Sequence, residues 1–391
     1  MRILFIHNRY QQAGGEDIAV ATDAQLLREK GHAVEIVSFQ NKPDEGWLDK
    51  MAAGGKAIYN HRSYKKIINS IEDFQPDVIH VHNLFFVASP SILFAARRKK
   101  IPVVLTVHNY RLICANALLL RDNKPCELCV DSSFPIYGAK YRCYRNSVAQ
   151  SALVTGITGV HKVWGTWRRK VNKYIALTQF SKSKLLSSSL RLAEEQIIVK
   201  PNFILDPGEG LDKRDDFFLF VGRLAKEKGV YELMHAFSGM ELKLRVIGDG
   251  PEKESLQRQF GDASNITFAG NMEKQSVLAA MKKCKALIFP SLWYEGLPFT
   301  IIESFATGTP VLASRLGSME ELIQNAFNGY HFEPSSEDIK RKVMEYAQAD
   351  QQTQRNLQAG ARKTYLDKYH PDTHYKSILA IYNSVVSELA S

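Results

Sequence analysis

The sequence predicts an α/β protein with two doubly wound parallel-sheet domains that face each other across a deep cleft. The chain has 391 residues, of which 45% are hydrophobic, and this is enough for more than one core. Short apolar runs alternate with amphipathic segments in both halves, which is the signature of βαβ units. A polar stretch, LDPGEGLDKRDD, lies between the halves and is typical of a loop.

Buried strands are predicted from short runs rich in Val, Ile, Leu and Phe. In the first half these runs are ILFI, AVEIVSF, DVIHVH, PVVLTVH and YIALT, and in the second half they are FFLFVGR, KLRVIGDG, ITFAG, ALIFP and PVLAS. Helices are predicted between them, at residues 17–30, 90–100, 181–190, 227–237, 252–260, 273–283 and 301–307.

The domain boundary is predicted in VKPNFI, at residues 200–204. We expect an N-terminal domain at residues 1–200, with a cysteine-rich insertion at 112–146, and a C-terminal domain at 201–371. Residues 372–391 form a last helix that can return to the N-terminal domain. Ligands of parallel sheets bind at the carboxyl ends of the strands, so the chemistry is expected there.

The net charge of +10 is concentrated in the first half. Residues 1–200 hold 29 Lys and Arg against 16 Asp and Glu, whereas residues 201–391 hold 22 against 25. One basic cluster is usually a solvated face, but several in one half favour a polyanionic partner. In VWGTWRRKVNKY, Trp164 and Trp167 stand beside basic residues. This mixture favours an amphipathic segment on an anionic membrane surface.

No run approaches the roughly eighteen apolar residues of a membrane-spanning helix. The N-terminus MRILFIHNRY enters a strand-like run directly and lacks the features of a signal peptide. We expect a cytoplasmic protein that lies peripherally on the inner face of the plasma membrane. Nucleic-acid binding is the other use of a basic surface, but no helix-turn-helix, RNA-recognition or zinc-finger pattern occurs.

The stretch WYEGLPFTIIES places Glu295 and Glu303 on either side of a Gly-Pro turn, directly after the run ALIFP. One interpretation is structural, because Thr300 and Glu303 fit a capping box with Thr300 as the N-cap. The other is a ligand site, because a loop at a strand's carboxyl end and the start of the next helix both favour an anion. The two interpretations are compatible.

Other polar residues also follow predicted strands. Arg223 and Lys228 follow the first strand of the second domain and suit a diphosphate, although solvated helix-start residues are the alternative. His108 ends a strand in TVHN, where a structural role is the alternative. No D-x-D pair occurs, so we expect no divalent cation on the diphosphate.

Glycines stand where backbone amides could approach a ligand closely. Gly14 and Gly15 open the first predicted helix, and Gly250 lies in the turn VIGDGPE. Each is equally compatible with a plain turn. The dinucleotide fingerprint G-x-G-x-x-G is missing, which argues against an NAD-linked enzyme.

Four of the five cysteines cluster with the spacing C-x11-C-x2-C-x13-C, namely Cys114, Cys126, Cys129 and Cys143. Four thiolates can hold a structural zinc ion. The alternative is a set of unconnected thiols, because the outer spacings match no standard zinc finger, and disulfides are disfavoured in the cytoplasm. Cys284 is expected in the core.

Together these motifs resemble the retaining glycosyltransferases of family 4, the glycosyl transferases group 1, which have the GT-B fold of two Rossmann-like domains. The resemblance covers nearly the whole chain. It rests on Gly14-Gly15, TVHN, KPNFI, VGRLAKEKG, VIGDGPE, FAGNME and FPSLWYEGLPFTIIESFATGTPV. The E-x7-E spacing and the trailing A-x-G-x-P-V are its most specific parts. Pro298 departs from the EGFGL of many members and removes one backbone donor.

The resemblance implies that a nucleotide-sugar donor binds mainly to the second domain. Glu295 would contact the donor sugar and Glu303 the ribose hydroxyls. Arg223 and Lys228 would stabilise the leaving diphosphate. The other implied contacts are His108 near the reacting carbon, Gly14 and Gly15 over the phosphates, Gly250 near the nucleotide, and Leu297, Pro298, Phe299 and Thr300 along the sugar and diphosphate.

The implied enzyme is a hexosyltransferase that uses a UDP- or GDP-sugar and retains the configuration of the sugar. Its implied acceptor is a saccharide or a polyprenyl-diphosphate-linked saccharide in the synthesis of a cell-surface polysaccharide, such as exopolysaccharide, capsule or O-antigen. Retention is implied to need no enzymatic nucleophile, because the leaving phosphate helps to deprotonate the acceptor. A GT-B epimerase or phosphorylase is the nearest alternative, and a basic nucleic-acid-binding protein is a remote one.

Overall fold

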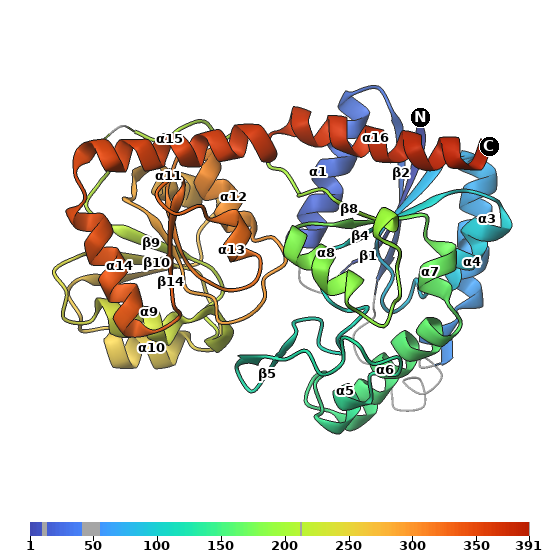
Figure 1. Ribbon diagram of the computed structural model, residues 1–391, viewed down its shortest axis with the longest axis horizontal. Coiled ribbons are helices and arrows are strands. Elements are labelled where there is room, and N and C mark those ends of the chain that lie inside the picture. The colour runs from blue at the N-terminus through green and yellow to red at the C-terminus, as the bar shows by residue number, and fades with distance from the viewer. Residues whose placement is uncertain (10–13, 41–54, 212, 391) are drawn as a thin grey trace. The chain divides into compact units, whose positions relative to one another are not determined.

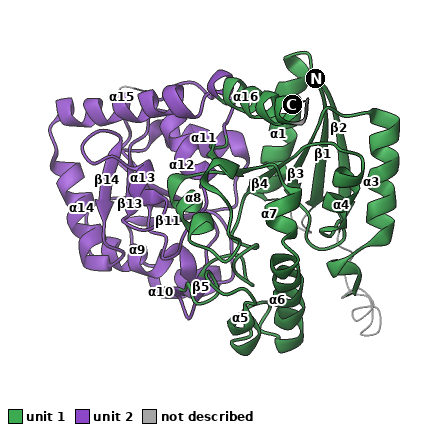
Figure 2. Ribbon diagram, turned by 45° about the vertical axis from the view of Figure 1, so that its right-hand side comes forward, with its two compact units in different colours: residues 1–119, 126–202, 374–391 green, residues 120–125, 203–373 purple. Residues whose placement is uncertain are grey.

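A computed structural model describes residues 1–9, 14–40, 55–211 and 213–390. The chain divides into two compact units (Figure 2). Unit 1 comprises Met1–Leu119, Cys126–Asn202 and His374–Ser391, and unit 2 comprises Leu120–Pro125 and Phe203–Thr373. Each unit contains a six-stranded parallel sheet with helices packed around it. The α/β class predicted from the alternating pattern is confirmed.

The sheet of unit 1 has the order β2-β1-β3-β4-β7-β8, and all neighbouring strands are parallel. Its strands are β1 (Arg2–Arg9), β2 (Ala33–Gln40), β3 (Val78–Asn83), β4 (Val103–Val107), β7 (Lys173–Ala176) and β8 (Ile197–Val199). The first five match predicted runs. β8 was not predicted, because its three residues are too few to show a pattern.

Helices of unit 1 follow most of these strands. They are α1 (Gly15–Glu29), α3 (His61–Phe74), α4 (Ser91–Arg98), α5 (Ile136–Lys140), α6 (Val148–Val163), α7 (Thr166–Lys170) and α8 (Gln179–Leu186). α3 was missed, although its start has a clear signal: the Asn60 side chain accepts hydrogen bonds from the amides of Arg62 and Ser63. A hairpin of β5 (Leu120–Arg121) and β6 (Lys124–Pro125) precedes α5.

The segment VWGTWRRKVNKY, which was expected to be amphipathic, is divided between two helices. α6 ends at Val163, and Gly165 adopts a left-handed conformation with φ of 66° before α7 begins. Trp164 is 55% exposed, whereas Trp167 is 1% exposed. Trp164 therefore lies at the surface, whereas Trp167 is part of the core. Among the helices of the described residues, none is both long and apolar enough to cross a membrane.

The last helix, α16 (Pro371–Ala390), completes unit 1 from His374 onward (Figure 1). It buries residues at helical spacing, Ile378, Ile381, Tyr382 and Val385. These side chains share a core cluster with Phe5 of β1 and with residues of α1, β3, β4 and β7. The C-terminal residues are thus part of the hydrophobic core of unit 1.

A buried polar cluster joins α16 to the rest of unit 1. His374 Nε2 lies 3.0 Å from Asp23 Oδ1 of α1, and Lys200 Nζ lies 3.1 Å from His374 Nδ1. All three residues are buried. Burial by itself raises the pKa of Asp23, but the charges of His374 and Lys200 outweigh it and hold this pKa well below its usual value. Burial lowers the pKa of Lys200 to about 8, against the opposing effect of Asp23. Removing one partner would leave a buried charge unpaired.

The sheet of unit 2 has the order β11-β10-β9-β12-β13-β14. Its strands are β9 (Phe218–Val221), β10 (Leu244–Ile247), β11 (Ile266–Gly270), β12 (Leu287–Phe289), β13 (Val311–Ser314) and β14 (Gly329–Phe332). β9 to β13 match predicted runs, and β14 was missed. The helices are η2 (Lys226–Lys228), α9 (Val230–Phe237), α10 (Lys253–Phe260), α11 (Lys274–Lys283), α12 (Phe299–Ala306), α13 (Met319–Leu322), α14 (Ser336–Gln348) and α15 (Gln351–Lys368).

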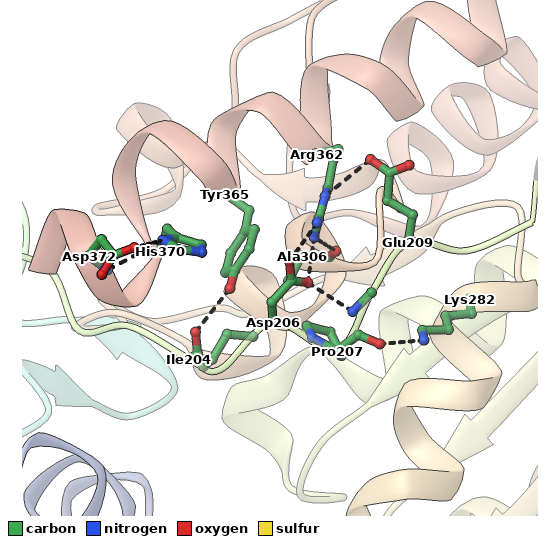
Figure 3. Close-up of polar contacts among 11 residues, drawn as sticks. Ile204, Asp206, Pro207, Glu209, Lys282, Ala306, Arg362, Tyr365, His370 and Asp372 are labelled. Atoms are coloured by element: carbon green, nitrogen blue, oxygen red, sulfur yellow. Dashed lines mark hydrogen bonds and ion pairs between the residues drawn. The ribbon is translucent and has the colours of Figure 1, made fainter. Parts of the chain in front are cut away.

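Hydrogen bonds and an ion pair hold the first residues of unit 2 against its helices (Figure 3). Arg362 of α15 forms a two-fold ion pair with Asp206, with Nη1–Oδ1 and Nη2–Oδ2 distances of 2.7 and 2.6 Å. Arg362 Nη1 also donates to the carbonyl of Ala306 at 2.6 Å. Tyr365, one turn further along α15, donates its hydroxyl to the carbonyl of Ile204 at 3.1 Å. Residues 204–206 are therefore held against the helices of unit 2.

We expect Arg362→Ala to lower the free energy of unfolding of unit 2 by about 1–2 kcal/mol, because it removes a two-fold ion pair whose carboxylate is only partly exposed. Urea unfolding followed by circular dichroism would measure the change. Arg355→Ala is the control, because Arg355 is an exposed residue of the same helix; it should change stability by less than about 0.5 kcal/mol. Equal effects of the two substitutions would contradict the role of the ion pair.

Unit 1 should lose stability below about pH 6.5, because burial holds the pKa of several histidines below the value of an unfolded chain. Burial lowers the pKa of His7 and His374, and it lowers the pKa of His80, His82 and His108 much further. The unfolded chain takes up a proton on each of these last three histidines as the pH falls through 6.5, whereas the folded chain keeps them neutral. Each one should therefore favour unfolding by about 1.4 kcal/mol per pH unit.

Urea unfolding at about pH 7.5 and about pH 5.5 would measure this dependence. His80→Gln is the informative variant, because His80 is fully buried between the Tyr382 hydroxyl and Thr106 Oγ1, each 2.7 Å away. It should lower stability at neutral pH and reduce the loss between the two pH values. The same free energy of unfolding at both pH values in the native sequence would contradict the prediction.

Candidate functional site

Charged residues gather where the central strands of unit 2 end. Arg223 follows β9, and the loop from Pro290 to Glu295 follows β12, the strand that pairs with β9. Parallel neighbours end at the same edge of a sheet, so these two loops are adjacent. The backbone amide of Leu292 donates to the carbonyl of Glu227 at 2.9 Å, which ties the β12 loop to η2.

A close backbone approach places Lys228 in this group. Gly229 follows Lys228 and has a left-handed φ of 66°. A Cβ atom at this position would lie 1.9 Å from the carbonyl oxygen of Pro290, which no side chain can do. Glycine therefore allows η2 to lie directly against the β12 loop.

Lys228 and Glu295 form an ion pair at the centre of the site. Lys228 Nζ lies 2.6 Å from Glu295 Oε1, and Ser291 Oγ donates to the same oxygen at 2.6 Å. Glu295 is only 6% exposed, so its charge needs these partners. The Lys228 ammonium also lies 5.4 Å from the ring centre of Trp293, within range of a cation–π interaction. The lysine is thus held by a carboxylate and an aromatic face.

Glu303 lies in α12 and is 6% exposed. Its carboxylate pairs with the ammonium of Lys274, the first residue of α11, whose side chain is 58% exposed. An exposed lysine is a weak partner, and a ligand could replace it at little cost. Glu303 therefore offers a buried carboxylate whose partner is easily displaced.

The capping box predicted with Thr300 is wrong. α12 begins at Phe299, its N-cap is Pro298, and no side chain caps it. Thr300 consequently lies inside the first turn, and Glu303 faces Lys274 instead of the helix start. Proline fixes the backbone at the entry of the helix, and α12 consequently begins two residues earlier than the capping box predicts. Leu297 is buried, whereas Pro298, Phe299 and Thr300 are partly exposed.

Arg223 is exposed, and no hydrogen bond or ion pair of its side chain is seen among the described residues. Gly250 has a packing role beside it. A Cβ atom at Gly250 would lie 2.4 Å from the carbonyl oxygen of Leu224, and the Leu224 amide donates to the carbonyl of Asp249 at 2.9 Å. Gly250 thus allows the loop after β10 to support the loop that carries Arg223.

In unit 1 the predicted residue His108 lies at the carboxyl edge of the sheet, directly after β4. Its Nε2 atom lies 3.0 Å from Nδ1 of His82, the last but one residue of the neighbouring β3, and the rings stack with centroids 5.3 Å apart. Burial lowers the pKa of His108 to about 3, although the charge of Asp23 opposes this. A neutral imidazole can hydrogen-bond a hydroxyl but cannot neutralise a phosphate.

Gly14 and Gly15 lie at the start of α1, at the same edge as His108. Asn109 Nδ2, next to His108, lies 3.4 Å from Glu16 Oε2 of α1. The amide of Gly14 already donates to Asp17 Oδ2 at 3.0 Å, and the other oxygen of this carboxylate lies 2.8 Å from His7 Nε2. A phosphate at this amide would have to displace the carboxylate of Asp17.

Cys114, Cys126, Cys129 and Cys143 all belong to unit 1 and form no disulfide. Cys284 is fully buried in unit 2, as expected for a core residue. In the part of the chain that the structure describes, no group of three or more His, Cys, Asp or Glu side chains is placed to hold a metal ion as it stands.

Several residues of the unit 2 site were not found by sequence reasoning, namely Lys274, Ser291, Trp293 and Ser318. Ser318 Oγ donates to the carbonyl of Glu295 at 2.8 Å and fixes its backbone. Ser291 and Trp293 lie within the quoted motif, so their closeness to Glu295 was a usable signal. Lys274 and Ser318 come from other loops, and only the fold brings them to the site.

Comparison with known proteins identifies the family of the chain. The model of the glycosyl transferases group 1 matches residues 203–364, and the model of glycosyltransferase family 4 matches residues 13–204. The first covers most of unit 2, including both glutamates, and the second covers most of the sheet of unit 1. Together the two models account for most of the chain.

Individual relatives are distant. An uncharacterized 42.6 kDa protein in the cps region of Klebsiella pneumoniae is 25% identical over 367 residues, which cover 85% of this chain and 90% of that one. The O-antigen chain mannosyltransferase C of Escherichia coli is 23% identical over 44% of this chain and 46% of its own. The crystal structure of Anabaena HepE in complex with UDP matches 98% of this chain and 100% of that one, with a TM-score of 0.68 and 16% identity.

The two family models match one unit each, and together they span residues 13–364. The chain therefore belongs to the family 4, group 1 glycosyltransferases, and it is a glycosyltransferase with the GT-B fold.

Proposed function

We propose that unit 2 binds a nucleotide-sugar donor at the carboxyl edge of its sheet. The pairing of Lys228 with the buried Glu295 supports this proposal most strongly, because it places an oriented acceptor and a cation side by side. Glu295 accepts hydrogen bonds from hydroxyls of the donor sugar. The backbone from Leu297 to Thr300 borders the sugar and the diphosphate.

Arg223 and Lys228 stabilise the diphosphate as it leaves. Arg223 is exposed beside the loop of Lys228, and a guanidinium suits two oxygens of a phosphate group. The charge of the leaving group grows in the transition state, so cations that are already positioned lower the barrier. Lys228 is held by Glu295 at 2.6 Å and remains on one side of the site.

Glu303 binds the ribose hydroxyls of the nucleotide. Its carboxylate is buried, and its present partner, Lys274, is more than half exposed. A diol can take the place of the ammonium on the carboxylate and gain two charge-assisted hydrogen bonds. Lys274 is then free to turn toward solvent or toward a phosphate.

His108 of unit 1 serves the sugar and acceptor side of the reaction as a neutral hydrogen-bonding group. The reaction retains the configuration of the sugar, with the leaving phosphate helping to deprotonate the acceptor hydroxyl. The acceptor is a saccharide, free or lipid-linked, of a cell-surface polysaccharide, at the inner face of the membrane. The O-antigen chain mannosyltransferase among the relatives and the UDP bound by HepE support this choice of acceptor and donor classes.

A thermal-shift panel tests the proposal. It contains UDP, GDP, ADP, the matching nucleotide sugars, NAD and a short DNA duplex. A ligand at about 100 times its dissociation constant adds roughly 2.7 kcal/mol to the free energy of unfolding, which gives a shift of a few degrees. A shift with one nucleoside diphosphate and its sugars supports the proposal. A shift with NAD or DNA alone would overturn it.

Glu303→Ala should weaken binding of the stabilising nucleoside diphosphate by roughly 10- to 150-fold. The loss of hydrogen bonds to a charged group costs about 1.5–3 kcal/mol. Isothermal titration calorimetry would measure the affinity. Glu254→Ala is the matched control, because Glu254 is an exposed glutamate of α10 in the same unit. Unchanged affinity in a folded Glu303→Ala protein would remove this residue from the site.

A further inference from the structure

The segment of residues 112–146 contains little regular secondary structure. Its regular elements are two strands of two residues and a helix of five. Several of its large apolar side chains are exposed, including Leu128 (47%), Phe134 (43%) and Ile136 (59%). Its first residues are buried, among them Leu112, Ile113 and Leu119, but the rest has few ladder hydrogen bonds, and such a segment is often held in one conformation by a disulfide or a metal ion. This same segment carries four of the five cysteines.

Cys114 and Cys143 are 29 positions apart in the sequence and meet around Gly138. The amide of Cys143 donates to the carbonyl of Gly138 at 2.9 Å. A Cβ atom at Gly138 would lie 2.6 Å from Cβ of Ala115, so the backbone next to Cys114 touches the start of α5. Glycine at this position permits the approach.

Cys129 lies at the same place. Its Sγ lies 3.8 Å from the carbonyl oxygen of Pro135, and the amide of Gly138 donates to that oxygen at 3.1 Å. Cys126 precedes Cys129 by three residues, and its amide donates to the carbonyl of Leu119 at 2.7 Å, which ties it to the stretch that follows Cys114. Cys114, Cys129 and Cys143 therefore lie around residues 135–138 of the chain, and Cys126 lies beside Leu119.

A cation lies close to Cys129. The amide of Ser132 donates to the carbonyl of Cys129 at 3.3 Å, and Lys162 Nζ donates to the carbonyl of Ser132 at 3.1 Å and to Ser189 Oγ at 2.8 Å. An ammonium at this place stabilises thiolates nearby.

We propose that Cys114, Cys126, Cys129 and Cys143 bind one zinc ion, which holds the segment of residues 112–146 in a single conformation. Four S–H groups lose their protons and form four Zn–S bonds, so one Zn²⁺ is bound and four protons are released. The resulting centre has a net charge of −2, and the ammonium of Lys162 offsets part of it. A purely thiolate donor set favours zinc over magnesium, calcium or manganese.

No group of three or more His, Cys, Asp or Glu side chains among the described residues is already placed to hold a metal ion. The four thiols therefore do not meet at one point in this structure. All four cysteines lie in turns or irregular loops, outside helices and strands. Closing the site therefore moves loops and leaves the sheet of unit 1 and α6 in place. Zinc binding and the ordering of these loops are therefore coupled, as they are in other small metal sites.

Metal analysis by mass spectrometry of the whole protein, purified without chelator, tests the proposal. About one equivalent of zinc per chain is expected. Cys126→Ser and Cys143→Ser should each lose most of it. Cys284→Ala is the matched control and should keep it, because Cys284 is fully buried in unit 2. Zinc that persists in both serine variants would overturn the proposal.

Thiol titration of the native protein is the second measurement, because the serine variants could fail to fold. A mercurial reagent added to the native sequence should release zinc in step with the loss of four thiols, and a colorimetric zinc indicator would follow the release. Fewer than about 0.2 equivalents of zinc in folded protein would overturn the proposal. Two disulfides among these four cysteines, seen by peptide mass analysis, would also overturn it. Neither readout depends on sugar transfer.

Discussion

The close contact between Gly229 and the carbonyl oxygen of Pro290 is the constraint on which the unit 2 site depends. Only a residue without a side chain fits there, since a Cβ atom would lie 1.9 Å from that oxygen. The contact places Lys228 against Glu295, and the ion pair offsets the free-energy cost of burying the carboxylate. Ser291 and Ser318 then fix the side chain and the backbone of Glu295.

The two units treat charge differently at the carboxyl edges of their sheets. Unit 2 keeps full charges there, with Arg223 exposed and Lys228 paired. Unit 1 buries His82 and stacks it on His108, and burial keeps both imidazoles neutral. A charged edge suits a diphosphate, and a neutral hydrogen-bonding edge suits hydroxyl groups. In the proposed reaction the charged edge would hold the anionic leaving group, and the neutral edge would hydrogen-bond sugar hydroxyls.

Most strands were predictable, because ten apolar runs marked β1 to β4, β7 and β9 to β13. Short strands such as β8 and β14 gave too few residues for a pattern. At the site, Glu295 and Glu303 were visible from their spacing, but Lys274 and Ser318 were not, because only the fold brings them near. The capping box at Thr300 matched a local rule that Pro298 overrides. The segment VWGTWRRKVNKY was expected to be amphipathic, but only the fold shows that Trp167 lies in the core.

The most direct test of the account is a crystal structure of the protein with the nucleoside diphosphate that stabilises it most. The account predicts that the ribose hydroxyls lie within hydrogen-bond distance of Glu303, in place of Lys274. It also predicts that the diphosphate contacts Arg223 and Lys228 at the carboxyl edge of β9 and β12. A nucleotide bound elsewhere, with the Glu303–Lys274 and Glu295–Lys228 pairs unchanged, would contradict it.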